Sequence, residues 1–312
     1  MNSTRRQWLA LAAATALTGP ALAAAPALPA QKTLKLFGAR IRYHELGRPG
    51  AKPTLVLLHG LGSSAAGDWG QVMPQLAKTH HVLALDHLGF GNSDKPFIQY
   101  GIQIWVDFLG EFLREKKVAD FMLMGESLGG WIAAQYTLQA LRGTAIGASF
   151  ALPRPTRLVL CDAAGFREAL SWRFDKPAAP DAVPSRVGAG PSLAGEKALL
   201  ARIFRAPSFN TEDAIRRGMG WSLSKGDSHT IASVYADPAI LNESVDGQLG
   251  EITIPTLVVW GEHDELLPLK LGQRFAAEIP GARLAVVAGS GHAPMIETPQ
   301  AFLAVLGDFL TR

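Results

Sequence analysis

Phe121-Met-Leu-Met-Gly-Glu-Ser127-Leu-Gly-Gly-Trp131 is the stretch of sequence that decides the fold of this chain. A short apolar run ends at Gly125, and an alanine-rich helical pattern follows it, so Ser127 is expected on the turn between a buried strand and a helix. Gly125 and Gly129 remove side chains where such a turn would crowd itself. The turn exposes the Ser127 hydroxyl beside the free N–H groups of a helix N-terminus, which stabilise an anion. The stretch therefore predicts a nucleophilic serine, with a purely structural tight turn as the alternative.

The remaining strands are expected in short apolar segments on both sides of this turn. They are Thr33–Leu36, Ile41–His44, Thr54–Leu58, His81–Leu85, Leu158–Cys161, Thr256–Trp260 and Leu284–Val287. The first two are expected to form a hairpin through Gly38, and helical patterns at Trp69–Lys78 and Ile102–Lys117 separate later strands. Continuously apolar strands that alternate with helices predict an α/β fold, with a mostly parallel sheet and helices on both faces.

One region interrupts this alternation. Residues 166–250 contain no good buried strand, only helical patterns around Leu199, Ile215 and Ile231. We interpret this region as a helical cap or lid inserted between two strands. The core is then expected in residues 33–165 and 251–312.

The active groups of an open parallel sheet gather at the carboxyl ends of its strands. A short set of reactive side chains is expected there. The set is His59, Asp86, Ser127, Asp162, Asp264 and His292. A serine nucleophile needs a base, an acid that orients the base, and donors for the oxyanion. His292, in a glycine-rich loop after the last strand, is the predicted base. Asp264 is the predicted orienting acid, and Asp162 competes with it because an acid can also be presented from the preceding strand.

The glycine-rich loop that starts at His59 is expected to act through its backbone. The N–H of Leu61 is predicted to face the oxyanion together with the N–H of Leu128, the residue after the nucleophile. His59 is expected to support this loop by hydrogen bonds, and Asp86 to fix a turn.

Together these motifs resemble the α/β-hydrolase superfamily, in its esterase- and lipase-like branch with a helical cap. The resemblance rests on Gly125 to Gly129, the His59-Gly60 loop, Asp86 to Ser93, Gly261 to Asp264 and Gly291-His292, in the chain order Ser, Asp, His. It implies an eight-stranded sheet, acyl-enzyme chemistry, and neither a metal nor an organic cofactor. Serine at position 127 is unlike the dehalogenase and epoxide-hydrolase branches, which use aspartate as the nucleophile.

The predicted reaction is hydrolysis of a carboxylic ester, with an apolar substrate of small to medium size. Trp172, Met219 and Trp221 in the cap are candidates for the lining of the acyl pocket, and packing within the cap is the alternative for each. In this superfamily the same triad also supports hydrolysis of a carbon–carbon bond in diketone-like ring-cleavage products. A ligand-binding, receptor-like member of the fold is a further alternative.

Composition and the N-terminus bear on partners and compartment. The formal net charge of +3 is small and the basic residues are scattered, which indicates no nucleic-acid partner. The single cysteine, Cys161, excludes an intramolecular disulfide. Residues 1–23 have the order of a secretory signal: a positive segment with Arg5 and Arg6, an apolar run, and small residues before a cleavage site after Ala23. The paired arginines resemble a bacterial twin-arginine signal, with an ordinary secretory signal or an uncleaved anchor as alternatives. The mature protein is therefore expected to be exported, periplasmic or secreted, without a stable membrane span.

Overall fold

The computed structural model describes residues 27–50, 53–143, 151–170 and 192–311. The signal-like segment, residues 1–23, lies outside these ranges. No helix in the described ranges has both the length and the apolar character that crossing a bilayer requires.

The centre of the fold is an eight-stranded sheet in the order β1-β2-β4-β3-β5-β6-β7-β8. Only β2 runs antiparallel to its neighbours, and all other pairs are parallel. The strands are β1 (Lys32–Leu36), β2 (Ala39–Leu46), β3 (Thr54–Leu58), β4 (His81–Leu85), β5 (Phe121–Glu126), β6 (Arg157–Cys161), β7 (Thr256–Gly261) and β8 (Arg283–Val287). Each strand expected from the sequence is present, so the predicted α/β fold is confirmed.

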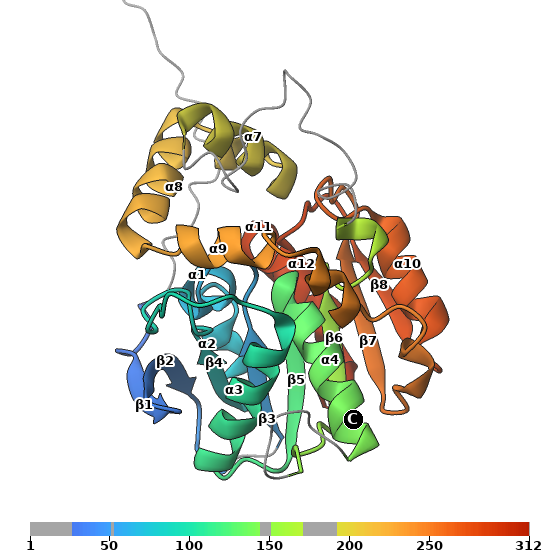
Figure 1. Ribbon diagram of the computed structural model, residues 1–312. Coiled ribbons are helices and arrows are strands. Elements are labelled where there is room, and N and C mark those ends of the chain that lie inside the picture. Colours follow the sequence, from blue (N-terminus) through green and yellow to red (C-terminus); the bar gives the residue numbers. More distant parts are fainter. Residues whose placement is uncertain (1–26, 51–52, 144–150, 171–191, 312) are drawn as a thin grey trace, which may run out of the picture.

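Helices cover both faces of the sheet because the central strands are apolar on both sides. Val56 and Leu58 pack toward α3 (Ile102–Glu115), α4 (Leu128–Arg142) and α10 (Leu269–Glu278). Leu55 and Leu57 pack toward α1 (Ala65–Trp69), α2 (Met73–Leu76), α11 (Pro294–Glu297) and α12 (Pro299–Leu306). In Figure 1, α3 and α4 lie in front of the sheet. The alternation of neighbouring residues between two buried clusters follows from the two-residue repeat of a strand.

The helix expected at Trp69–Lys78 is wrong in its extent. Two short helices replace it, because α1 begins at Ala65 and ends at Trp69, and α2 begins at Met73. Ser64 starts α1 early by accepting a hydrogen bond from the Gly67 N–H at 3.0 Å. A proline in the first turn of α2 suits a new helix start rather than a helix interior.

Between β6 and β7 the described residues contain helices and no strand. These are α7 (Leu193–Ile203), α8 (Glu212–Lys225) and α9 (Ser228–Val234), with the short 3-10 helices η1 (Pro207–Phe209), η2 (Pro238–Glu243) and η3 (Leu249–Glu251); a fourth, η4 (Gly307–Phe309), follows α12. Figure 1 shows α7 and α8 beyond α9, on one side of the layered core. The division into a core and a cap at residues 166 and 250 stays a prediction.

A buried acidic side chain ties the edge of the sheet together. Glu45 on β2 accepts hydrogen bonds from Lys32 at 2.8 Å and Lys116 at 3.0 Å, and lies 2.9 Å from Nε2 of His81. Burial alone would raise the pKa of Glu45, but these three partners outweigh it and lower that pKa to about 2. Glu45 is therefore ionised in the folded protein at neutral pH.

Candidate active site

Ser127 lies on a sharp turn between β5 and α4. Its backbone has φ 50° and ψ −114°, outside the regions that L-residues usually occupy. The turn is closed by contacts that only glycine permits: a β-carbon at Gly125 would lie 2.1 Å from the carbonyl oxygen of Gly129. One at Gly129 would lie 2.3 Å from the carbonyl oxygen of Leu58. The sequence therefore forces a strained turn that presents a half-buried serine above the sheet.

His292 lies in the loop between β8 and α11 and is oriented by Asp264. Its Nδ1 is 2.7 Å from Oδ2 of Asp264, and both residues are buried. The other oxygen of Asp264 accepts the N–H groups of Leu266 and Leu267, each at 2.8 Å. The carboxylate is thus fixed on one side by the backbone and on the other by the imidazole. An imidazole held in this way carries its proton on Nδ1 and offers Nε2 as a base.

Nε2 of His292 faces the turn that carries the serine, at 3.3 Å from Oε1 of Glu126, the residue before Ser127. Among the described residues, no hydrogen bond joins the Ser127 hydroxyl to His292. Such bonds are often long before substrate binds. The transfer of a proton from Ser127 to His292 therefore stays a prediction.

Asp162, the competing acid, has a different task in the structure. Its Oδ1 accepts the N–H of Gly261 at 2.8 Å, so it fixes the end of β7 beside Asp264. Burial and the charge of Asp264 raise the pKa of Asp162 well above its usual range, which favours the neutral form of this carboxyl. The geometry favours Asp264 as the acid that orients His292.

The two predicted oxyanion donors belong to backbone segments that meet at the serine. A β-carbon on Gly60 would lie 3.2 Å from Cβ of Ser127, which places the loop after β3 directly beside the nucleophile. Leu61 follows Gly60, and Leu128 begins α4. Neither the Leu61 N–H nor the Leu128 N–H donates a hydrogen bond to any described residue. Both are available for an oxyanion, as the role predicted for them requires.

The loop after β3 is held by buried polar side chains. The Gly60 N–H donates to Oδ2 of Asp68 at 2.7 Å, and the Ser63 hydroxyl donates to Oδ1 of the same residue at 2.5 Å. Nε2 of His59 accepts the His87 N–H at 3.0 Å, and the His59 carbonyl lies 3.0 Å from Nε2 of His87. Burial and the neighbouring His59 lower the pKa of His87 well below its usual value, so it is neutral. His59 supports the loop, as its position in the sequence indicated.

Helices α7 and α8, in the region predicted to be the cap, contact this site. The indole N–H of Trp221 on α8 donates to the carbonyl of Gly62 at 3.3 Å, and the Lys225 ammonium lies 4.3 Å from the centre of the same indole ring. The backbone N–H of His292 donates to the carbonyl of Ile203, the last residue of α7, at 2.7 Å. Met219 is half-buried on α8. Trp172, the third pocket candidate, lies outside the described residues.

Two acidic residues that sequence reasoning did not select also belong to the site. Glu126 contacts the base, as described above. Glu297 on α11 accepts the N–H of Gly291 at 2.6 Å and also the N–H of Ala206 in the segment after α7, so it joins the histidine loop to the cap. The place of Glu126 in the serine motif could have pointed to it as a site residue. The sequence around Glu297 contains no such signal.

Three of these groups are also close enough to be considered as metal ligands. Asp162, Asp264 and His292 have potential ligand atoms within 4.8 Å of one another. The contact between Nδ1 of His292 and Oδ2 of Asp264 already joins two of these residues. Orientation of the base accounts for the grouping, and we assign no metal to it.

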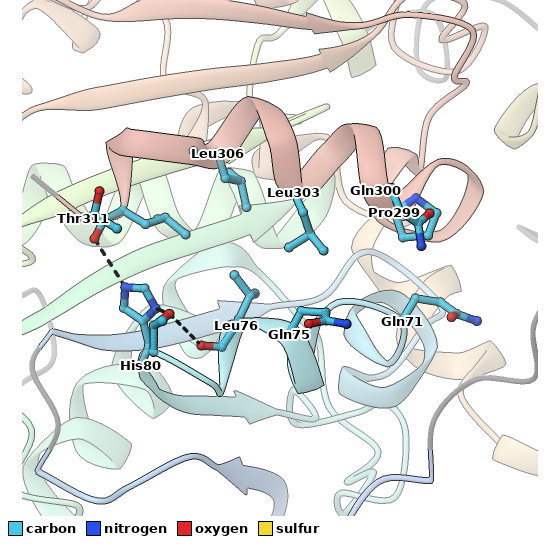
Figure 2. Close-up of a pocket in the computed structure, with 12 residues that line it drawn as sticks. Gln71, Gln75, Leu76, His80, Pro299, Gln300, Leu303, Leu306 and Thr311 are labelled. Atoms are coloured by element: carbon cyan, nitrogen blue, oxygen red, sulfur yellow. Dashed lines mark hydrogen bonds between the residues drawn. The ribbon is translucent and has the colours of Figure 1, made fainter.

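A groove of about 400 Å³ lies elsewhere, between α2 and α12 (Figure 2). Leu76, Leu303 and Leu306 form its apolar lining, and His80 at one end lies 3.3 Å from the Leu310 carbonyl oxygen. None of the predicted site residues lines it, so it is separate from the candidate active site.

Comparisons with known proteins agree with this architecture. Residues 53–299 match the family model of the α/β hydrolase fold. The 2-hydroxymuconate semialdehyde hydrolase of Pseudomonas sp. (strain CF600) is 32% identical over 283 residues, which cover 88% of this chain and 91% of the relative.

Two solved structures extend the comparison. The crystal structure of a mutant meta-cleavage product hydrolase (CumD), a protein of Pseudomonas fluorescens IP01, has a TM-score of 0.74 and 25% identity over 90% of this chain and 97% of that chain. The enol-lactonase of Burkholderia xenovorans LB400 has a TM-score of 0.72 and 25% identity over 90% of this chain and 100% of that chain.

Proposed function

Because this chain belongs to the α/β-hydrolase fold family, we propose that it is a serine hydrolase of diketone-like ring-cleavage products and that it cleaves a carbon–carbon bond. The observation that carries the proposal is the likeness to 2-hydroxymuconate semialdehyde hydrolase, at 32% identity over 88% of the chain. The motifs alone favoured a carboxylic ester, with this reaction as the alternative. The relatives reverse that order.

The first half of the reaction is acyl transfer to the enzyme. His292, held by Asp264, removes the proton from Ser127, whose oxygen attacks a substrate carbonyl carbon. The N–H groups of Leu61 and Leu128 receive the oxyanion that forms. Loss of one such donor typically costs about 3 kcal/mol, or 10²–10³-fold in turnover.

The collapse of the tetrahedral adduct distinguishes carbon–carbon cleavage from ester cleavage. When the tetrahedral adduct collapses, the bond between the carbonyl carbon and its neighbouring carbon breaks, and the electron pair stays on the departing carbon. A second carbonyl in the substrate stabilises that pair as an enolate, which is why a diketone-like compound is required. The departing fragment takes up the proton held by His292. Water then attacks the acyl-enzyme, and the net reaction adds one water to give an acid and a ketone.

The test compares two substrate classes on the purified protein. We expect turnover of 2-hydroxymuconate semialdehyde, followed by loss of its visible absorbance, to exceed turnover of p-nitrophenyl acetate and butyrate in kcat/KM. Ser127→Ala should fold normally and lose both activities. Steady turnover of the esters with none of the ring-cleavage compound would contradict the proposal.

A second candidate is hydrolysis of an ester or lactone, which the likeness to the enol-lactonase favours. The same serine, base and oxyanion donors would serve, with an alkoxide in place of the enolate as leaving group. A lactone added to the substrate comparison separates the two. A single burst of nitrophenol without further turnover would instead favour a receptor-like protein.

A further inference from the structure

Glu126, the last residue of β5, lies between the His292 imidazole and the loop after β3. Its side chain is 5% exposed, and its Oε1 lies 3.3 Å from Nε2 of His292. That nitrogen is the one the predicted reaction uses as a base. Glu126 therefore touches the base at its working atom.

The second oxygen of Glu126 reaches the loop after β3. A β-carbon at Gly60 would lie 2.1 Å from Oε2, so this oxygen packs directly on the backbone of the loop. The charge of Asp68 also acts on the Glu126 carboxyl. Asp68 in turn accepts the Gly60 N–H at 2.7 Å. One side chain thus connects the base to the segment that carries the Leu61 N–H.

We propose that Glu126 is a positioning residue that holds the loop after β3, here called the oxyanion loop, and the His292 imidazole in place on either side of Ser127. This role goes beyond the triad and rests on the proposed serine nucleophile. Asp68, Asp162, Asp264 and His292 are the ionisable groups that surround Glu126.

This environment favours the neutral form of the Glu126 carboxyl. Burial, and then the charge of Asp68, raise the pKa of Glu126 well above its usual range, with Asp162 and Asp264 adding to the effect. A neutral carboxyl carries its proton on one oxygen and leaves the other as an acceptor, and Oε1 is the oxygen that faces Nε2 of His292. Oε1 is then a carbonyl-like acceptor. After His292 has been protonated, Oε1 can accept a hydrogen bond from the Nε2–H group. It binds that group less strongly than a charged carboxylate would.

Two variants test the role. Glu126→Gln keeps the shape against the loop and a carbonyl acceptor for Nε2, whereas Glu126→Leu removes the polar contact with Nε2. We expect kcat of E126L to fall about 10²-fold with KM little changed, because misplacement of catalytic groups by about 1 Å costs this much. E126Q should recover most of that loss. Thr137→Val, which removes a buried hydrogen bond on α4, controls for general loosening of the helix.

The rate at which a fluorophosphonate labels Ser127 gives a readout that does not depend on the natural substrate. E126L should label slowly and E126Q at close to the wild-type rate. Equal labelling and equal kcat for E126L and the wild type would overturn the proposal, as would an E126Q protein as slow as E126L. A wild-type protein that does not label at all would overturn the proposed nucleophile instead, and this role with it.

The neutral state has its own measurement. A carboxyl whose pKa is raised in the folded state destabilises the fold as pH rises from the unfolded pKa toward the folded one. The wild type should therefore lose stability relative to E126Q as pH rises above about 4.5. A wild type that gains stability relative to E126Q over this range would show that Glu126 is ionised, and would overturn the neutral link. This measurement also serves if E126L does not fold.

Discussion

Replacing Asp264 by asparagine is expected to lower kcat about 10⁴-fold, or roughly 5.5 kcal/mol in the barrier, as in triads where this exchange fixes the wrong imidazole tautomer. The structure explains why asparagine must act in this way. Oδ1 of Asp264 accepts two backbone N–H groups, from Leu266 and Leu267, each at 2.8 Å. The amide oxygen of Asn has to take that place.

The amide nitrogen then faces Nδ1 of His292, where Oδ2 now lies at 2.7 Å. A donor at this point requires Nδ1 to be the acceptor, so the imidazole proton moves to Nε2. Nε2 can then no longer take a proton from Ser127. The loss should appear in kcat with KM little changed, because substrate binding does not depend on the tautomer.

The assay is steady-state turnover of whichever ring-cleavage compound or ester the wild type hydrolyses, together with the rate of fluorophosphonate labelling. Asp162→Asn is the matched control, since its amide can keep the contact between Oδ1 and the Gly261 N–H. We expect the control to lose far less activity. A D264N protein within about tenfold of the wild type, against a predicted 10⁴, would refute this reasoning, and a large loss in D162N would make Asp162 the orienting acid.

Three other predictions concern different parts of the chain. Gly60→Ala would place a β-carbon 2.1 Å from Oε2 of Glu126 and displace the oxyanion loop. We expect about a 10²-fold loss in kcat together with a lower melting temperature, and a fully active variant would contradict the tight contact. Glu45→Gln should cost about 2 kcal/mol of unfolding free energy at pH 7, after allowance for solvent screening. Because the pKa of Glu45 is lowered to about 2, that difference should shrink as pH falls from about 4.5 toward 2; urea melts at several pH values measure it, and a constant difference would exclude an ionised Glu45. If export uses the twin-arginine route, a double change of Arg5 and Arg6 to lysine should leave the precursor inside the cell; normal export in cell fractionation would rule that route out.

The strands could be predicted because burial on both faces leaves a clear record in the sequence. Thr54–Leu58 has an apolar residue at almost every position, and both of its faces are buried in the structure. Helix limits were harder to predict, because several weak signals compete. Ser64 was available as a cap for an earlier helix start, but the apolar spacing after Trp69 suggested one longer helix.

That Ser127, Asp264 and His292 come from one edge of the sheet could be predicted, because parallel strands end there; their catalytic roles stay a prediction. Ser127 and Asp264 each come soon after a strand end, and His292 lies in the loop after the last strand, so topology alone brings them together. Glu126 is different, because its role depends on which way a strand-end side chain turns. In the structure it lies against Gly60 and His292, from two other segments, and no spacing rule contains that information.

The region between β6 and β7 shows why side-chain type alone is a poor guide to this part of the site. Trp221 and Met219 are candidates for the lining of the acyl pocket, and Trp221 contacts the loop after β3 through the Gly62 carbonyl at 3.3 Å. A contact with the base residue itself, however, comes from the backbone carbonyl of Ile203, which accepts the backbone N–H of His292 at 2.7 Å. Any residue at position 203 has that carbonyl. What places it there is the end of α7 against the histidine loop, where a β-carbon at Gly291 would lie 2.3 Å from the same oxygen. The glycine was visible in the sequence, but the segment for which it makes room was not.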